Sequence, residues 1–203
     1  MGDHHFDSIS ATYDDPEKQA RAQEIADAIR TRAGLTGRER LLEYGAGTGL
    51  VSQALAELVG TVTLADTSSG MREVARSKVA SGDLPASTTI WDLDLTEQAP
   101  PQETFDLIVT SLVLHHIQDL GPVLAGFRSL LAPGGQLAVA DLDSEDGSFH
   151  AHLHDFDGHD GFDRDGLAAQ LEQAGFVDIR VGDCSTVVKN GTTFPVFLAL
   201  ARR

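Results

Sequence analysis

The chain has 203 residues, with 15 Lys or Arg against 31 Asp or Glu, so its formal net charge is −16. This balance disfavours nucleic acids and anionic membrane surfaces as partners, because phosphate contacts need clustered basic side chains. A hydrophobic content of 41% excludes a disordered chain, and the single cysteine, Cys184, excludes an internal disulfide framework. With no membrane span or secretory signal visible, we expect one cytoplasmic domain over residues 1–203.

Helices and strands are predicted to alternate along the chain. After a start expected to be disordered (1–5), Asp15-Pro16 predicts a helix that ends near Gly34. Short apolar runs predict strands at 40–44, 61–65, 88–91, 105–110 and 136–140. A helix beginning at Asp163 precedes two final strands, at about 177–188 and 194–201. This alternation predicts a parallel α/β sheet that closes with an antiparallel hairpin.

A glycine-rich loop, Gly45-Ala46-Gly47-Thr48-Gly49, joins the first predicted strand to a helix. The order strand, loop and helix directs backbone N–H groups and a positive helix end toward an anionic group at the carboxyl edge of the sheet. Tight turns also use glycine, so the loop alone is weak evidence. The dinucleotide-binding fingerprint needs glycine at position 50, where this chain has Leu50, which disfavours a pyrophosphate-bearing cofactor.

Acidic residues stand at the carboxyl ends of the first three predicted strands. Glu43 lies two residues before the first loop glycine, Asp66 follows the second strand, and Asp92 follows the third. Any one of them alone is better explained as a solvated loop acid or a helix cap. Together they lie beside the glycine loop, where a carboxylate such as Asp66 can accept hydrogen bonds from two ribose hydroxyls. The group therefore favours a ligand that carries a ribose.

Five segments carry a family resemblance: LLEYGAGTGLVS (41–52), VTLADTSSGM (62–71), IWDLDL (90–95), FDLIVTSLVLHHI (105–117) and LLAPGGQLAVAD (130–141). In this order they resemble the class I S-adenosylmethionine-dependent methyltransferases of the small-molecule type. The resemblance implies a Rossmann-like, doubly wound α/β fold with a mostly parallel seven-stranded sheet and a C-terminal antiparallel hairpin. It also implies S-adenosyl-L-methionine as cofactor and transfer of its methyl group to a small molecule by in-line displacement.

The resemblance further implies how the chain is divided around the site. Residues 1–34 would form an N-terminal lid and helix, and residues 141–165 an acceptor-site loop. Glu43 would hold the methionine end, Asp66 the ribose hydroxyls, and Met71 and Asp92 the adenine, while Tyr13 either closes over the cofactor or only packs. The full set of implied cofactor contacts is Tyr13, Glu43, Gly45, Ala46, Gly47, Asp66, Thr67, Met71, Asp92, Leu93 and Ser111.

Histidines gather in two segments on the expected acceptor side. His115 is the candidate catalytic base, because imidazole titrates near neutral pH. The candidate substrate contacts are His116, His150, His154 and His159, although packing and capping of the next helix is the favoured interpretation for His116. In an extended chain His150, His152 and His154 would point to one side and could bind a transition metal. Spacing alone often misleads, so we predict no metal site.

Two other functional classes stay open from the sequence. One is a non-catalytic or metal-responsive binding protein on a methyltransferase scaffold. The other is an NAD-type oxidoreductase, against which Leu50 and Asp92 speak. Residues 111–114 lack the Asn-Pro-Pro-Tyr-like signature of exocyclic-amine DNA methylation, and Cys184 lies away from the position of a cytosine-attacking nucleophile. The acceptor, the methylated atom and the oligomeric state are not predicted.

Overall fold

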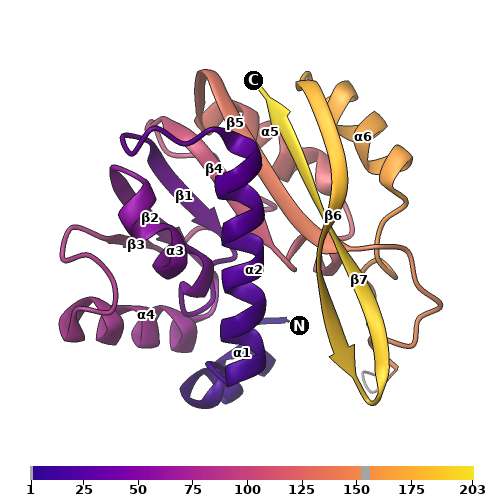
Figure 1. The fold of residues 1–203 in the computed structure, drawn as a ribbon, viewed down its shortest axis with the longest axis horizontal. Coiled ribbons are helices and arrows are strands. Elements are labelled where there is room, and N and C mark those ends of the chain that lie inside the picture. The colour runs from indigo at the N-terminus through magenta and orange to yellow at the C-terminus, as the bar shows by residue number, and fades with distance from the viewer. Residues whose placement is uncertain (1, 152–155) are drawn as a thin grey trace.

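The computed structural model describes residues 2–151 and 156–203, and helices alternate with strands along the chain (Figure 1). The helical elements are α1 (Gly2–Ile9), η1 (Ser10–Thr12), α2 (Pro16–Ala33), α3 (Leu50–Leu55), η2 (Ala56–Leu58), α4 (Ser69–Ser81), η3 (Leu114–His116), α5 (Leu120–Leu130) and α6 (Arg164–Gln173). The strands are β1 (Arg40–Tyr44), β2 (Thr61–Ala65), β3 (Thr89–Trp91), β4 (Phe105–Ser111), β5 (Leu131–Leu142), β6 (Val177–Lys189) and β7 (Thr192–Arg202). Within these residues no helix combines the length and apolarity needed to cross a lipid bilayer.

Seven strands of the described chain form one sheet in the order β3-β2-β1-β4-β5-β7-β6. Neighbouring strands from β3 to β5 pair in parallel, and β7 runs antiparallel to both β5 and β6. The predicted mostly parallel sheet with a closing antiparallel hairpin is therefore confirmed. Because the parallel strands share one direction, the carboxyl ends of β1, β2, β3 and β4 meet at the same edge, where open α/β sheets bind ligands.

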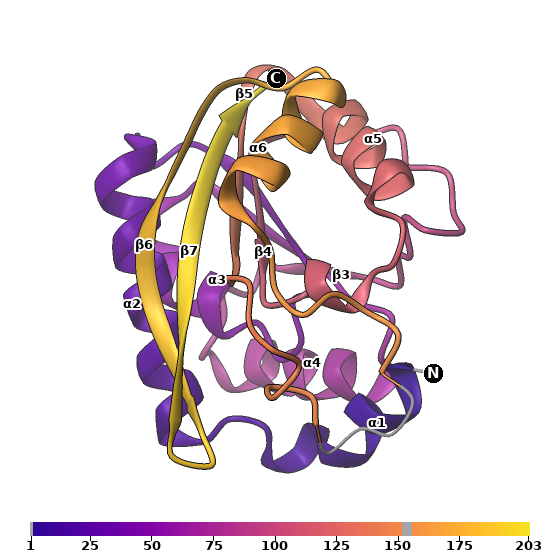
Figure 2. The same cartoon turned by 90° about the vertical axis from the view of Figure 1, so that its right-hand side faces the viewer.

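Two layers of helices cover the two faces of the sheet. Helices α2, α3 and α4 contribute to one apolar cluster, and α5 and α6 contribute to the other. Adjacent strand residues enter opposite clusters, as with Leu41 and Leu42 in β1, because successive side chains in a strand point to opposite faces. Figure 2 shows α2 on one side of the sheet, with α5 and α6 on the other.

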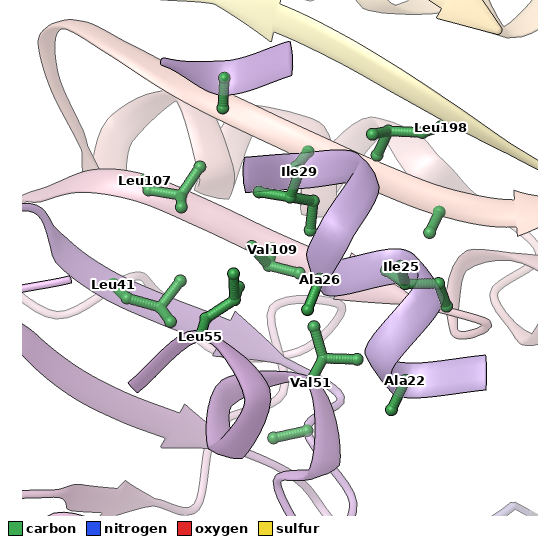
Figure 3. Packing of buried hydrophobic residues seen from close by; sticks show 14 of the residues in the cluster. Ala22, Ile25, Ala26, Ile29, Leu41, Val51, Leu55, Leu107, Val109 and Leu198 are labelled. Carbon is green, nitrogen blue, oxygen red and sulfur yellow. The ribbon is translucent and has the colours of Figure 1, made fainter. Parts of the chain in front are cut away.

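Helix α2 illustrates how local signals fix an element that borders the site. The carboxylate of its N-cap, Asp15, accepts a hydrogen bond from the backbone N–H of Lys18, and Gly34 ends the helix at φ +66°. Ile25 and Ile29 point from the helix toward the sheet, as Figure 3 shows, and both side chains are fully buried. Burying each one stabilises the fold by about 1.5–3 kcal/mol. Both predicted ends of this helix are confirmed.

One local prediction was wrong. Helix α1 begins at Gly2, inside the start expected to be disordered, and packs against α4. Pro133-Gly134-Gly135 lies within β5, where the pairing register to β4 shifts between Phe105 and Leu107. His150, in the segment 141–165 expected to be a loop, lies in a turn. His152 and His154 lie outside the described residues.

Candidate active site

A cleft with about 450 Å³ of empty space opens at the carboxyl edge of the sheet, beside α2. Six of the predicted cofactor contacts line it: Tyr13, Glu43, Gly45, Ala46, Gly47 and Ser111. The cleft is also lined by residues that the sequence did not single out, including Lys18 and Arg21. The structure thus brings the glycine loop, the end of β4 and the N-terminal segment together around one space.

The glycine loop adopts backbone angles that favour glycine. Gly45, Gly47 and Gly49 have φ angles of +66°, +55° and +80°. A Cβ atom on Gly47 would lie 3.8 Å from both the Met71 sulfur and the Tyr13 Cε1 atom. The missing side chain therefore leaves open a space between the loop, Tyr13 and Met71, and any larger residue would fill it.

Glu43 is a buried carboxylate at the floor of the cleft. Its Oε2 atom accepts a hydrogen bond of 2.9 Å from the backbone N–H of Ser52, in α3. Burial raises the pKa of Glu43 to about 7, although the hydrogen bonds from Ser52 favour the charged form. The group is poised to become fully ionised when a cationic partner arrives, because an opposite charge nearby lowers a carboxyl pKa.

Asp66 organises the glycine loop from the end of β2. One carboxylate oxygen, Oδ2, accepts a hydrogen bond of 2.6 Å from the backbone N–H of Gly47. The other, Oδ1, accepts one of 2.8 Å from the N–H of Ser68, whose hydroxyl caps α4. Asp66 therefore ties the loop after β1 to the helix after β2.

Asp92 has a partner that the sequence did not predict. Its two carboxylate oxygens lie 3.0 and 2.8 Å from the two terminal nitrogens of Arg72, a bidentate pair. The same guanidinium donates to the backbone carbonyls of Asp66 and Thr67. Leu93, next to Asp92, is buried. Arg72 thus links the ends of β2 and β3.

The N-terminal segment is fastened across the cleft. The Asp14 carboxylate forms an ion pair of 2.6 Å with Lys78 in α4 and accepts a hydrogen bond from the hydroxyl of Thr48 in the glycine loop. Asp7 in α1 accepts a hydrogen bond of 2.8 Å from the backbone N–H of Gly70. Burial raises the pKa of Tyr13, so its phenol stays protonated at neutral pH.

Two cations on α2 were missed by the sequence reasoning. Lys18 and Arg21 lie three residues apart on one face of the helix, and both line the cleft. They stand out because the chain as a whole carries a net charge of −16. Their spacing in the sequence was a usable signal, but helical periodicity alone does not say which face meets the cleft.

His115, which follows β4, forms a buried pair with Asp141 near the carboxyl end of β5. Its Nδ1 atom lies 2.6 Å from Oδ1 of Asp141, and the two side chains are 2% and 1% exposed. Asp141 also accepts hydrogen bonds from the backbone N–H groups of Leu114, His115 and Leu142. With Nδ1–H directed at Asp141, Nε2 carries the lone pair, and that atom has no hydrogen-bond partner among the described residues.

The other candidate histidines lie at different places around this pair. His116 and His150 lie beside His115, with ring centroids 4.2 and 5.2 Å from its ring. One ligand nitrogen from each of these three histidines lies within 4.8 Å of the other two. His159 instead points to the backbone, with Nε2 2.9 Å from the carbonyl oxygen of Ile117. His154 lies outside the described residues.

The sequence model of the family described as a methyltransferase domain matches residues 17–181. The chain therefore belongs to the methyltransferase domain family. This membership, the fold and the site segments confirm the resemblance to the class I S-adenosylmethionine-dependent methyltransferases.

Individual relatives agree with the family match. An uncharacterized methyltransferase of Schizosaccharomyces pombe is 34% identical over 120 residues, which cover 56% of this chain and 42% of that protein. The chain thus spans less than half the length of this relative. The N-methyltransferase NodS of Bradyrhizobium japonicum, solved with S-adenosylhomocysteine, shares the fold with a TM-score of 0.74 at 18% identity, covering 99% of this chain and 97% of NodS.

The fold is also shared with a protein that is named for a different activity. The [4+2]-cyclase SpnF has a TM-score of 0.77 to this chain at 17% identity, covering 99% of this chain and 94% of SpnF. Fold likeness alone therefore does not establish methyl transfer, because the residues of the site decide the chemistry.

Proposed function

We propose that this protein transfers a methyl group from S-adenosylmethionine to a small-molecule acceptor. The observation that carries the proposal is the pairing of a buried carboxylate, Glu43, with an open glycine loop in one cleft. The absent Cβ of Gly47 keeps the loop from filling the space beside Tyr13 and Met71. Family membership supports the same cofactor class.

The chain offers a partner for each end of that cofactor. Glu43, at the floor of the cleft, would accept hydrogen bonds from the ammonium group of the methionine moiety. Arg21 and Lys18, which line the same cleft, would face the carboxylate. Asp66 would accept from the ribose hydroxyls, and the Arg72–Asp92 pair would flank the adenine. In these assignments, each charged group of the cofactor would lie beside a protein group of opposite charge.

The acceptor side, by which we mean the part of the site that holds His115 and Asp141, would supply a base. When bound, S-adenosylmethionine supplies a methyl group activated for in-line displacement, so the protein mainly has to align the acceptor and remove its proton. Nε2 of His115 carries a lone pair for that proton, while Asp141 would stabilise the imidazolium that forms. This arrangement suits an acceptor whose O–H, N–H or acidic C–H loses a proton during transfer.

A small acceptor fits the enclosure of this side. His115 and His150 are only 1% and 5% exposed, so a molecule that reaches Nε2 of His115 has to enter an enclosed space. Residues 141–165 would then form part of the wall around it. The excess of acidic groups on the chain disfavours polyanionic acceptors, which supports a neutral or cationic molecule.

Calorimetric titration tests the cofactor assignment directly. We expect S-adenosylhomocysteine to bind the full chain with one-to-one stoichiometry, whereas NAD gives no binding heat. The contrast separates the proposal from an oxidoreductase built on the same sheet. Binding of NAD without binding of S-adenosylhomocysteine would overturn the proposed function.

A further inference from the structure

Three imidazoles from two distant parts of the chain meet in the interior. His115 and His116 lie in η3, after β4, whereas His150 lies in the turn that follows β5. One ligand nitrogen from each lies within 4.8 Å of the other two. Around a tetrahedral zinc ion with Zn–N bonds of about 2.0–2.1 Å, ligand nitrogens are about 3.4 Å apart. The His116 and His150 rings would have to rotate to bring the three nitrogens to that spacing.

Asp141 gives this cluster the support typical of a metal site. Metal-bound histidines commonly donate their second ring N–H to a carboxylate, which fixes the tautomer and strengthens the ligand. Asp141 receives Nδ1–H of His115 at 2.6 Å, which leaves Nε2 as the ligand atom. Nε2 is buried and has no hydrogen-bond partner in the described part of the chain. An unsatisfied buried acceptor is uncommon, and a metal ion would satisfy it.

The charge of the cluster also favours a cation. The only ion-pair partner of the buried Asp141 among the described residues is His115. The ligand imidazoles are neutral when they bind metal, so the carboxylate would offset half of the charge of a divalent ion. Aromatic rings line the cluster: Phe156 stacks on His150 at 3.7 Å between centroids, and Phe149 lies 6.1 Å from His115. Such a shell keeps water away and strengthens the electrostatic attraction.

The three imidazole nitrogens favour some metal ions over others. Mg²⁺ and Ca²⁺ require oxygen ligands, which the three imidazoles do not provide. Imidazole suits zinc, nickel and copper, and a set of three histidines with an open fourth position is typical of tetrahedral zinc. From the sequence, His150 groups with His152 and His154, and we predict no metal site. The structure groups His150 with His115 and His116 instead, and this second group has the geometry for a metal ion.

We propose that His115, His116 and His150 form a binding site for a zinc ion, with Asp141 orienting His115. The site stands on its geometry and does not depend on the methyl-transfer proposal. The two proposals meet at one atom, because Nε2 of His115 cannot hold zinc and accept a proton at the same time. Bound zinc would therefore remove the base and inhibit methyl transfer.

Zinc binding to the full-length, untagged chain tests the site without any assay of activity. Zinc would be titrated against a chromophoric chelator, with His150→Ala and His116→Ala as the test variants and His159→Gln as the matched control. We expect one tight equivalent of zinc in the unmodified chain and in the control, because His159 already points to the Ile117 carbonyl. Each test variant should lose that equivalent, and Asp141→Asn should bind about 10–100-fold more weakly.

Titration with S-adenosylhomocysteine shows that each variant is folded and keeps the two proposals separate. If the unmodified chain takes no zinc from the chelator, or if His150→Ala and His116→Ala keep its affinity, the zinc site is wrong. Either result would leave the cofactor assignment untouched. Cobalt substitution gives a second readout: visible absorption bands of a tetrahedral Co²⁺ complex are expected in the unmodified chain and absent in His150→Ala.

Discussion

At the carboxyl edge of the sheet, the cofactor side and the acceptor side are built from different kinds of contact. On the cofactor side, backbone N–H groups meet carboxylates, as in the contacts from Gly47 to Asp66 and from Ser52 to Glu43. On the acceptor side, Asp141 also accepts hydrogen bonds from backbone N–H groups, but the His115 ring that it holds is surrounded by histidine and phenylalanine rings. Side chains can change without disturbing the backbone. We therefore expect the acceptor side to select the molecule that is methylated, and the cofactor side to depend mainly on the course of the backbone.

A side chain added at Gly47 in the glycine loop should abolish binding of the cofactor. In Gly47→Val, the branched side chain would occupy the space between Tyr13 and Met71, so we expect no measurable binding of S-adenosylhomocysteine by calorimetry. Gly82→Val is the matched control, because Gly82 also has a positive φ but a Cβ there would meet no atom within 4 Å. The backbone strain is thus shared, and only the cofactor space differs. Retained binding in Gly47→Val would place the cofactor elsewhere.

Removing the imidazole should affect only the acceptor side. In His115→Asn the amide can still donate to Asp141, but the lone pair at Nε2 is lost. We expect kcat to fall by about 100-fold or more while the affinity for S-adenosylhomocysteine is unchanged. The rate would be measured as transfer of a labelled methyl group from S-adenosylmethionine to a panel of small acceptors. An unchanged kcat would show that His115 is not the base.

Removing the carboxylate of Asp66 should weaken the cofactor side without abolishing it. Asp66→Ala would take away the proposed acceptor for the ribose hydroxyls and the hydrogen bond that holds Gly47. Hydrogen bonds to charged groups contribute about 1.5–3 kcal/mol, so we expect a loss of affinity for S-adenosylhomocysteine of at least about tenfold. Asp106→Ala is the control, since Asp106 pairs with Arg40 near the start of β4, at the opposite edge of the sheet. Equal affinities in the two variants would refute the assignment of Asp66.

The smallest expected effect is a pH dependence on the cofactor side. Glu43 has a pKa raised to about 7 by burial, and only its ionised form attracts the ammonium group of the cofactor. Affinity for S-adenosylhomocysteine should therefore fall as the pH decreases through 7, by about fourfold between pH 8 and pH 6.5. Glu43→Gln should be weaker at every pH and lose this dependence. A wild-type affinity that is constant over this range would show that Glu43 does not bind the ammonium group.

The two sides also differ in how far they could be predicted from the sequence. Strand limits followed from apolar runs, and the caps at Asp15 and Gly34 followed from local chemistry, so β1, β2 and α2 were placed correctly. The glycine loop and its acids were found because their spacing along the chain is short. The Asp141 partner of His115 lies 26 residues away, and only tertiary packing brings the two together.

Other features escaped prediction for similar reasons. The orientation of Lys18 and Arg21 toward the cleft depends on how α2 rotates against the sheet, which periodicity does not determine. The meeting of His150 with His115 and His116 depends on the path of an irregular loop, and such loops carry no repeating pattern. The pairing of Asp92 with Arg72 depends on how α4 packs beside β3, which the sequence alone does not show.

A crystal structure of the chain with S-adenosylhomocysteine would test the central claim most directly, because that claim places the cofactor between the two sides. The account predicts the amino group of the ligand against Glu43, the ribose hydroxyls at Asp66, and the sulfur facing the side that holds His115. A ligand bound outside the cleft, or one whose sulfur points away from His115, would contradict it.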